Sequence, residues 1–496
     1  MTTETPTTAD AAPSLGSVQM LIGGEQVDAA DGQTFDVMNP ATGELLAKAP
    51  LGGPEDVNRA VAAAQKALDD PKGFSSWSAA KRGRALQKLS NLAKDHIEEL
   101  AQLESRNVGK PIAGARGEAL AVSLVFEYYA GAANKHFGET IPTSRPGLDF
   151  TLREPIGVVG LIVPWNFPMN MASWKLGPAL ATGNACILKP ASYTPLSALK
   201  LGELALEAGF PPGIVNVVTG PGGSAGAAIA AHPGIGKVAF TGETTTGQEI
   251  LRLASGNVKK VSLELGGKSP NIVFADADLD RFARESPYAV FDNAGQDCCA
   301  RSRIFVEASV HDRVVEAFTE ATRNVKVGDP ADDQTEMGSL VSQRQRERVA
   351  DYIQVGRDEG AELVYGGEAP TGDPFDAGAY LMPTIFDGCR TDMRIVREEI
   401  FGPVVAIIPF ADEAEAVRLA NDTPYGLSGS VWSRDIGKAI RVAKGVKAGV
   451  LSVNSNSSVH TEAPFGGYKM SGIGRELGMH ALDLFTEVKN VFVDLT

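Results

Sequence analysis

Residues 156–189 read IGVVGLIVPWNFPMNMASWKLGPALATGNACILK, and this stretch decides the fold. The apolar runs 158–163 and 185–189 predict strands, and residues 174–182 between them predict a helix. Strands that alternate with helices in this way build a parallel sheet with helices on both faces. We therefore expect a parallel α/β sheet whose ligand lies at the carboxyl ends of its strands.

The same alternation runs through much of the chain. It predicts further strands at 215–218, 237–240 and 261–265 and helices at 195–208, 225–231 and 245–254. A second series after Gly267 predicts strands near 271–274, 303–306, 404–409, 430–432 and 450–454. Ahead of both series, the sequence predicts short strands within 18–50 and amphipathic helices at 54–68 and 79–106. We expect an α/β protein with two Rossmann-like parallel-sheet lobes.

The composition indicates a large soluble protein with more than one core. The chain has 496 residues, of which 43% are hydrophobic and 22% are charged. A net charge of -15 argues against nucleic acid or an anionic membrane as a partner, because both attract clustered Lys and Arg. No apolar run approaches the roughly 20 residues of a membrane span. We therefore expect neither a nucleic-acid partner nor a membrane span.

The N-terminus and the cysteines bear on location and on metals. Residues 1–17 are rich in Thr, Ala and Pro without a basic start or an apolar centre, so they predict a disordered tail and no signal peptide. Cytoplasmic residence is the resulting expectation. Four cysteines in so long a chain predict reduced thiols and no disulfide framework. Neither these cysteines nor the six scattered histidines have zinc-site spacing, so we expect no metal.

One cysteine lies on a glycine-kinked turn between a helical run and a strand. Residues 293–303 read NAGQDCCARSR, and residues 303–307 predict the strand. At such a junction, backbone N–H groups favour a thiolate and can hold a developing oxyanion. Cys298 is therefore a candidate nucleophile. A buried free cysteine is the alternative on this stretch alone.

Residues 261–270 read VSLELGGKSP, and a carboxylate stands in the apolar strand 261–265, just before the Gly-Gly break. An acid in such a strand is costly unless it is paired or useful, and burial raises its pKa toward that of a general base. Glu264 is therefore a candidate base. The structural alternative is that it pairs with Lys268 or caps a turn.

A third stretch, IVPWNFP at residues 162–168, ends an apolar strand in two prolines around the Asn166 amide. Together with EEIFGP at 398–403 and PFGGYKMSG at 464–472, these stretches resemble the motifs of the aldehyde dehydrogenase superfamily, in its order and at its spacing. The resemblance runs from about Met20 to the C-terminus. Five separated motifs in register are far more specific than any one of them.

The resemblance implies oxidation of an aldehyde to the free acid. In the family's chemistry Cys298 attacks the carbonyl carbon, and the Asn166 amide and the Cys298 N–H hold the oxyanion. Water activated by Glu264 then cleaves the thioester. Members that pass the acyl group to coenzyme A lack that glutamate, so its presence favours hydrolysis. Lys175 and Glu476 match family positions proposed for proton relay, and surface charge is the alternative for both.

The resemblance also implies NAD or NADP as cofactor. It places the pyrophosphate at residues 240–244, where a strand meets a helix N-terminus, and the nicotinamide ribose at Glu399 beside Phe401. The family commonly has Ser where this chain has Glu243. A carboxylate beside a pyrophosphate is unfavourable, so we expect Glu243 to point away or to cap the helix. The expected cofactor residues are Ile162, Pro164, Trp165, Lys189, Ser192, Gly222, Phe240, Thr241, Gly242, Glu243, Leu265, Glu399 and Phe401.

Two stretches leave details of cofactor binding open. GPGGSA at 220–225 fits the dinucleotide fingerprint but lacks an acidic partner about 20 residues on, so a packing loop and a cofactor contact are equal alternatives. Many NAD-preferring family members have Glu where Ser192 stands, and that acid repels a 2′-phosphate. Ser192 leaves Lys189 free to pair with this phosphate, so we expect NADP to be tolerated. The alternative is that Lys189 binds ribose hydroxyls and NAD stays preferred.

The family's apolar aldehyde tunnel selects poorly between similar substrates. Asp297 is a candidate contact for a substrate cation, and relatives that act on aminoaldehydes share its Gly-Gln-Asp-Cys run. This motivates an ω-aminoaldehyde, with a turn role for Asp297 as the alternative. A semialdehyde acid or a broad range of aliphatic and aromatic aldehydes are the other choices. Cys299 fits no essential role and is expected in the tunnel wall, where it could be a reversible oxidation partner of Cys298. The expected substrate residues are Phe167, Met171, Trp174, Phe291, Asp297, Cys299, Val459 and Phe465.

Domain boundaries and assembly follow from the same resemblance. We expect a dinucleotide-binding domain at 18–136 and 154–266, a catalytic domain at 267–468, and an oligomerisation element at 137–153 and 482–496. The first segment of that element is polar and punctuated by Pro and Gly, and the second alternates like an edge strand that needs a cover. In the family the two segments join across a subunit interface, so the resemblance implies a homodimer or a homotetramer.

Two other classes of protein compete with this interpretation. A cofactor-independent thiol esterase would use the same Cys298 and Glu264. A catalytically retired, crystallin-like binding protein would lose the nucleophile, the base or the amide, and this chain keeps Cys298, Glu264 and Asn166.

Overall fold

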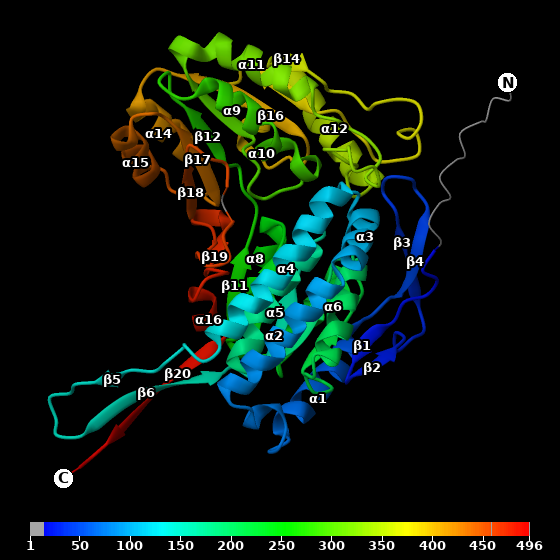
Figure 1. The fold of residues 1–496 in the computed structure, drawn as a ribbon, viewed down its shortest axis with the longest axis vertical. Helices are drawn as coiled ribbons and strands as arrows, with labels where there is room; N and C mark the ends of the chain where they lie inside the picture. The colour runs from blue at the N-terminus through cyan, green and yellow to red at the C-terminus, as the bar shows by residue number, and fades with distance from the viewer. Residues whose placement is uncertain (1–13, 458, 496) are drawn as a thin grey trace.

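The computed structural model describes residues 14–457 and 459–495. Two α/β lobes lie one above the other, and a long β arm projects from the lower lobe (Figure 1). Of the expected N-terminal tail, residues 1–13 lie outside the described residues. The residues that follow are ordered, because Leu15 N donates to the Leu46 carbonyl at 2.8 Å.

Eight strands form the sheet of the lower lobe, in the order β19-β11-β10-β7-β8-β9-β1-β2. Strands β11 to β9 are parallel, and β1, β2 and β19 are antiparallel to their neighbours. The predicted parallel strands of this half therefore form one sheet. The strand bounds are β1 (Met20–Ile22), β2 (Glu25–Val27), β7 (Val158–Ile162), β8 (Ala185–Lys189), β9 (Val215–Val217), β10 (Lys237–Thr241), β11 (Lys260–Glu264) and β19 (Gly472–Ile473).

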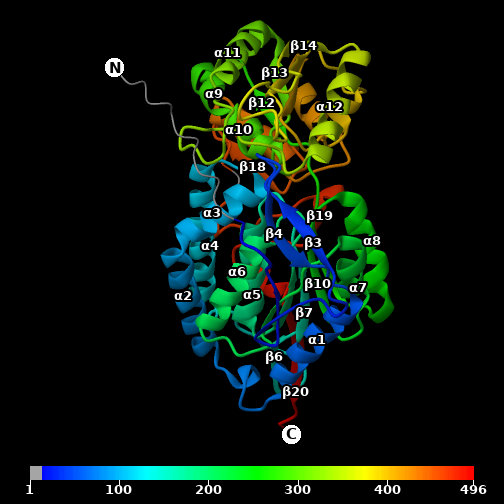
Figure 2. The ribbon, with the colours of Figure 1, turned by 90° about the vertical axis from the view of Figure 1, so that its right-hand side faces the viewer.

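Helices cover both faces of this sheet, with α2 to α6 on one side and α1, α7 and α8 on the other (Figure 2). The expected single helix at 79–106 is wrong, because His96 leaves the helical conformation and its ring instead bonds Glu99 in the next helix. The alanine-rich α4 was not predicted. The bounds are α1 (Pro54–Asp69), α2 (Ala79–Asp95), α3 (Ile97–Val108), α4 (Ile112–Ala132), α5 (Pro168–Thr182), α6 (Leu196–Glu207), α7 (Ala227–Ala231), α8 (Thr244–Ala254) and α16 (His480–Asp483).

The upper lobe is built on a seven-stranded sheet in the order β14-β15-β16-β13-β12-β17-β18. All its pairings are parallel except that of β14 with β15, two strands that the sequence did not predict. The strands are β12 (Pro270–Val273), β13 (Arg303–Glu307), β14 (Glu362–Tyr365), β15 (Thr384–Asp387), β16 (Val404–Phe410), β17 (Ser428–Trp432) and β18 (Val450–Val453). The helices are α9 (Leu279–Glu285), α10 (Tyr288–Phe291), α11 (His311–Arg323), α12 (Gln343–Asp358), α13 (Arg394–Arg397), α14 (Glu413–Asn421) and α15 (Ile436–Gly445).

Each lobe has its own large hydrophobic cluster, as expected for more than one core. The chain passes from one sheet to the other between Glu264, which ends β11, and Pro270, which begins β12. The residues between the two sheets therefore lie where the lobes meet. Among the described residues, no helix is both long and apolar enough to cross a membrane.

Two small antiparallel sheets complete the fold: β3 (Thr34–Met38) with β4 (Leu45–Pro50), and β20 (Thr486–Val493) with β6 (Leu148–Pro155) and β5 (Thr140–Ile141). In the second sheet, β20 pairs with β6 of its own chain over its whole length. The two segments therefore meet within one chain, and their joining across a subunit interface stays a prediction. The ion pair of Arg153 with Asp483, at 2.9 Å, holds the start of β20 beside β6.

Candidate active site

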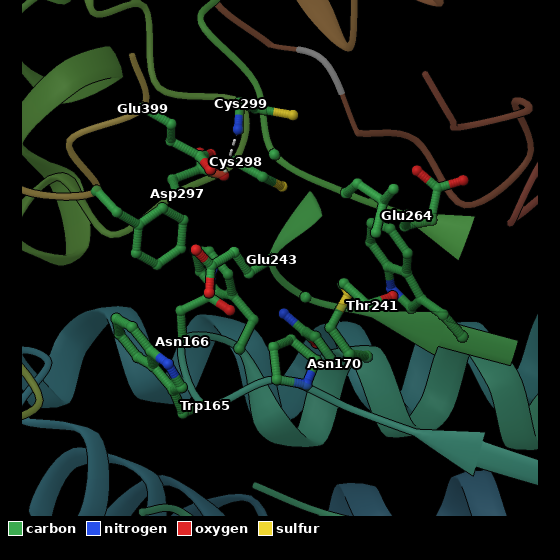
Figure 3. Close-up of a pocket in the computed structure, with 18 of the residues that line it drawn as sticks. Trp165, Asn166, Asn170, Thr241, Glu243, Glu264, Asp297, Cys298, Cys299 and Glu399 are labelled. Atoms are coloured by element: carbon green, nitrogen blue, oxygen red, sulfur yellow. Dashed lines mark hydrogen bonds between the residues drawn. The ribbon is translucent and has the colours of Figure 1, made fainter. Parts of the chain in front are cut away.

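A cavity opens between the lobes at the carboxyl ends of β7, β10 and β11 (Figure 3). On the side of the upper lobe, the turn before β13 forms part of its wall. The cavity brings together the three predicted chemical groups, Cys298, Glu264 and Asn166. The other predicted residues on its wall are Pro164, Trp165, Phe167, Met171, Trp174, Thr241, Gly242, Glu243, Leu265, Asp297, Cys299, Glu399, Phe401, Val459 and Phe465.

The turn that carries the candidate nucleophile, residues 293–299 and here called the nucleophile turn, is conformationally strained. Asn293, Ala294 and Gly295 have φ values of 50°, 54° and 70°, a left-handed run that costs free energy for the alanine. A Cβ atom on Gly295 would lie 2.1 Å from the Gly402 carbonyl oxygen, so glycine is required there. The turn thus packs closely against residues 399–402, the segment that carries Glu399.

The surroundings of Cys298 favour the neutral thiol over the thiolate. A hydrogen bond with the Cys299 thiol and burial both raise the pKa of Cys298 well above its usual value. The neighbouring Asp297 carboxylate accepts a hydrogen bond from Cys299 N at 2.8 Å, which is the turn role that the sequence left as an alternative. Cys298 therefore needs a base, or a change in its surroundings, before it can act as a nucleophile.

Asn166 lies in the loop between β7 and α5, two residues before the helix begins, and points toward the nucleophile turn. Its Nδ2 donates to the backbone carbonyl of Gln296 at 2.9 Å, two residues before Cys298. The side-chain amide is therefore a buried donor next to the thiol. A donor so placed is suited to stabilise charge on an oxygen attached to the atom under attack.

Glu264 ends β11 and is only 4% exposed. Its Oε2 has no hydrogen-bond partner, so pairing with Lys268 does not occur at that atom. Burial, and then repulsion from Glu476, raise the pKa of Glu264 well above its usual value. A Cβ atom on Gly466 would lie 2.6 Å from Oε1, so the carboxyl packs directly on a glycine. These features are those of a general base.

Lys175 and Glu476 lie behind Glu264 as a buried ion pair. Lys175 Nζ is 2.6 Å from Glu476 Oε1 and donates to Thr241 Oγ1 at 2.6 Å. Both residues are buried, so the alternative of surface charge is wrong. The pair lies outside the cavity lining, and it reaches the base electrostatically.

Two glycines let Glu399 approach the end of β11. Gly267 N donates to Glu399 Oε1 at 2.9 Å, and a Cβ atom on Gly266 would lie 2.2 Å from Oε2. Burial raises the pKa of Glu399 to about 7. Two residues along the chain from Glu399, the ring of Phe401 meets that of Trp165 edge to face at 5.1 Å. A carboxylate and two aromatic rings form a slot that suits a flat, hydroxyl-bearing ligand.

The N-terminus of α8 borders the same cavity. Thr244 Oγ1, in the first turn, is buried and has no hydrogen-bond partner. Glu243 precedes the helix and makes no side-chain cap, and it extends into the cavity (Figure 3). The expectation that Glu243 points away or caps the helix is wrong, because the open cavity gives its carboxylate access to water.

Lys189, Ser192 and Gly222 lie away from this cavity lining. Lys189 Nζ donates to the Pro190 carbonyl at 2.6 Å, and burial lowers the pKa of Lys189 to about 8. Ser192 Oγ donates to the Gly220 carbonyl at 3.0 Å, which ties the loop after β8 to the glycine-rich loop. Lys189 and Ser192 therefore bond loop carbonyls outside the cavity that holds Cys298. Ile162 and Phe240 are buried in the sheet behind the cavity and do not line it.

The expected tunnel residues divide into two groups. The rings of Trp174 and Phe465 meet at 5.1 Å on the cavity wall. Phe291 does not line the cavity, because it is buried in the core of the upper lobe with its ring 6.2 Å from that of Phe318. The expectation that Phe291 lines the tunnel is therefore wrong, because its ring packs in the hydrophobic core of the upper lobe.

Other lining residues were not predicted. Asn170, Gly266, Gln345 and Arg348 border the cavity as well. Gln345 and Arg348 lie on α12, where the charged sequence around them gives no signal that separates a cavity wall from a solvent face. The ligand-capable atoms of Asp297, Cys298 and Cys299 lie within 4.8 Å of one another. We assign these three residues to the nucleophile turn, and the absence of a metal stays a prediction.

Known proteins share this architecture and sequence. Residues 27–491 match the profile of the family described as "Aldehyde dehydrogenase family". A betaine aldehyde dehydrogenase of Bacillus subtilis (strain 168) is 44% identical over 477 residues, covering 96% of this chain and 97% of that protein.

Solved structures agree. A betaine aldehyde dehydrogenase from Staphylococcus aureus, in complex with NAD+, matches with a TM-score of 0.94 at 40% identity, over 96% of this chain and 94% of that one. The NAD+ complex of an aldehyde dehydrogenase from Bacillus cereus matches with a TM-score of 0.94 at 46% identity, over 97% of both chains. The chain therefore belongs to the aldehyde dehydrogenase family.

Proposed function

We propose that the protein oxidises an aldehyde to the carboxylic acid through a thioester on Cys298, with NAD or NADP as hydride acceptor. The observation that carries this proposal is the single cavity that holds Cys298, Glu264 and Asn166 on its walls. A thiol, a buried carboxyl of raised pKa and an amide donor are the groups that acyl transfer to water requires.

The residues present fit a dinucleotide. The unpartnered Thr244 hydroxyl at the start of α8 suits a pyrophosphate oxygen, and the helix N-terminus adds its N–H groups. Glu399 suits ribose hydroxyls, with Gly266 leaving room for its carboxylate. Trp165 and Phe401 would flank the nicotinamide end. When bound, the cofactor supplies the acceptor for the hydride.

Cys298 and Asn166 carry the first half of the reaction. The Cys298 sulfur bonds the carbonyl carbon, and the thiol proton passes to a base. The carbonyl oxygen gains the negative charge, which the Asn166 amide stabilises. Loss of hydride from that carbon then leaves a thioester. The apolar rings of Trp174 and Phe465 keep bulk water from this carbon.

Glu264 carries the second half. It takes a proton from a water molecule, which attacks the thioester carbon, and the C–S bond breaks to release the acid and the thiol. A raised pKa makes Glu264 a stronger base once it has lost its proton. The Lys175–Glu476 pair is positioned to accept charge changes at Glu264, which supports its assignment to proton relay.

Reduction of the nicotinamide, followed by absorbance, tests the proposal. Cys298→Ala is expected to abolish aldehyde-dependent reduction, and Cys299→Ala, the matched control on the neighbouring thiol, is expected to retain it. Ester hydrolysis that needs no nucleotide, without any nucleotide reduction, would favour the thiol esterase. Aldehyde-dependent reduction that persists in Cys298→Ala would exclude Cys298 as the nucleophile.

We propose an ω-aminoaldehyde as the substrate. Asp297 lies next to Cys298 on the cavity wall, whereas Glu243, Glu399 and Arg348 lie at the end that we assign to the cofactor. Such a lining favours a cationic or neutral aldehyde over a semialdehyde acid. Two relatives named above are betaine aldehyde dehydrogenases, which act on a cationic aldehyde by name.

The substrate test compares aldehydes of equal length that end in an ammonium, a methyl or a carboxylate group. Asp297→Asn is expected to raise the KM of the amino compound alone. Equal KM values for the amino and the methyl compounds in the wild-type protein would support a broad-range enzyme instead. The lowest KM for the carboxylate compound would support a semialdehyde acid.

We also propose the domain assignment and the assembly. The dinucleotide is assigned to residues 18–136 and 154–266 and the nucleophile to 267–468. The projecting arm supports a homodimer or a homotetramer, because exposed apolar side chains such as Val488, Phe492 and Leu152 lie on β20 and β6 far from the body of the chain. Sedimentation of the wild-type protein against Val488→Lys tests this proposal.

A further inference from the structure

A lysine lies directly behind the wall that carries Asn166. Lys110, in the bend between α3 and α4, is 2% exposed, and its Nζ donates to the Asn166 backbone carbonyl at 3.0 Å. The same ammonium lies 4.2 Å from the centroid of the Phe167 ring. Asn166 and Phe167 are consecutive residues of the cavity wall, so Lys110 supports this wall from outside.

Asn293, in the upper lobe, also bonds the Asn166 main chain. Its Nδ2 donates to the Asn166 carbonyl at 3.0 Å and lies 3.3 Å from the Gln296 carbonyl oxygen. The Asn166 amide donates to that same Gln296 carbonyl at 2.9 Å. Asn166 is therefore fixed at both ends, since its carbonyl accepts two hydrogen bonds and its amide is tied to the nucleophile turn.

The ammonium itself is confined by carboxyl groups. Lys110 Nζ forms an ion pair with Glu118 and lies 3.9 Å from Glu104 Oε1. Burial raises the pKa of Glu118 to about 8, and the attraction of Lys110 opposes that rise. Burial also raises the pKa of Asp292, which Lys110 lowers in the same way. An ammonium surrounded in this way has one favourable position, and that position is against Asn166.

We propose that Lys110 is a positioning residue for the oxyanion donor, and that with Asn293 it clamps the Asn166 main chain so that the side-chain amide stays aimed at Cys298. The inference rests on the proposed function, because it needs Asn166 to stabilise an oxyanion. Lys110 does not touch the cavity, so it acts through Asn166 and is not a catalytic residue.

The expected effect is on kcat. Loss of one oxyanion donor costs about 10²–10³ in rate, and a misplacement of about 1 Å costs about 10². Lys110→Met is therefore expected to lower kcat about 30- to 100-fold. The KM of the aldehyde and the affinity for NAD are expected to change less than about threefold, because Lys110 itself does not line the cavity.

A double-mutant cycle with Asn166→Ala tests the clamp. If Lys110 acts through Asn166, Lys110→Met lowers kcat about 30- to 100-fold in the wild-type background and less than about threefold in the Asn166→Ala background. Equal losses in both backgrounds, or a kcat within about threefold of wild type for Lys110→Met, would overturn the proposal. Lys110→Arg, which keeps a charged donor, is expected to recover part of the rate.

Two further variants guard against a failure to fold. Lys110→Met combined with Glu118→Gln removes both charges of the buried pair together. Asn293→Gly suits the left-handed backbone and removes the other arm of the clamp, so it is expected to lower kcat without adding to the effect of Lys110→Met. A full additive loss in the Asn293→Gly background overturns the clamp.

Alkylation of Cys298 by iodoacetamide gives a readout that develops no oxyanion. Its rate is expected to stay within about twofold of wild type in Lys110→Met, and a large fall would mean that the thiol itself had moved, which overturns the clamp. An active wild-type protein with additive losses overturns the clamp alone. A wild-type protein without Cys298-dependent aldehyde oxidation overturns the proposed function, and the clamp with it.

Discussion

Gly266→Ala moves one carboxylate without straining the backbone. The new Cβ atom would lie 2.2 Å from Glu399 Oε2, whereas favourable contact needs about 3.5 Å, so the carboxylate must shift by about 1 Å. Gly266 is not among the glycines with positive φ, and the clash falls on the end of a flexible side chain. The folded protein is therefore expected to accept the methyl group, and Glu399 to yield.

The size of the effect follows from the hydrogen bonds that this shift breaks. The bond from Gly267 N to Glu399 Oε1, at 2.9 Å, holds the carboxylate in place. A hydrogen bond to a charged group contributes about 1.5–3 kcal/mol, and loss of such a bond between Glu399 and a ribose hydroxyl corresponds to about 10- to 100-fold weaker binding. The thermal midpoint should change little, because the methyl group displaces no backbone.

Quenching of intrinsic fluorescence by NAD measures the dissociation constant. Gly266→Ala is expected to raise it about 10- to 100-fold, close to the effect of Glu399→Gln. In a Glu399→Ala background the same methyl group meets no carboxylate, so it should have no further effect. The reasoning is refuted if Gly266→Ala leaves the dissociation constant within about twofold of wild type, or weakens binding equally in both backgrounds.

Three further outcomes follow from the same site. Burial raises the pKa of Glu399 to about 7, so its ionised fraction grows about tenfold from pH 6 to pH 8. NAD affinity, titrated at fixed salt, is expected to rise over the same pH range in the wild-type protein and to stay constant in Glu399→Gln. Glu264→Gln should keep the rapid first turnover in stopped-flow absorbance and slow later turnovers by about 10² or more, and loss of the burst would contradict a role in deacylation. Ser192→Glu should raise the KM of NADP with little change for NAD, with Ser192→Gln as the neutral control of the same size.

Local sequence was sufficient to predict most strands of the two parallel sheets. Each strand is a short apolar run bounded by turn residues, and that signal is present in the run itself. The runs do not contain the strand order, because order depends on crossovers between residues far apart. Helix α4 escaped prediction for a related reason: its apolar residues are spread around the whole helix, so no helical stripe marks it.

Residues of the cavity were predicted where a motif carries its own chemistry, and contacts between residues far apart in the sequence were not. Cys298 and Glu264 stand out as polar groups in apolar or kinked stretches. Lys175 and Glu476 are 301 positions apart, and only the fold shows that one neutralises the other in the interior. Lys110 gave no signal for the same reason, since its role depends on the carbonyl of Asn166 in another segment.

The Lys175–Glu476 pair sets how readily Glu264 gives up its proton. Repulsion from Glu476 raises the pKa of Glu264, and attraction from Lys175 lowers it. Lys175→Met removes the attraction, so the pKa of Glu264 should rise further and the ionised base should appear only at higher pH. The acidic limb of the kcat profile should therefore move up by about one pH unit.

Thr241→Val is the matched control, because it removes a hydrogen-bond partner of Lys175 and keeps the charge. A profile that moves down in Lys175→Met would show that Glu476 had taken up a proton and stopped repelling Glu264, and an unchanged profile would show that the pair does not act on the base. Either result would contradict the assignment of Lys175 as the charge that keeps Glu264 able to ionise. The expected upward shift would instead explain why a buried ammonium is retained at the back of an acidic site.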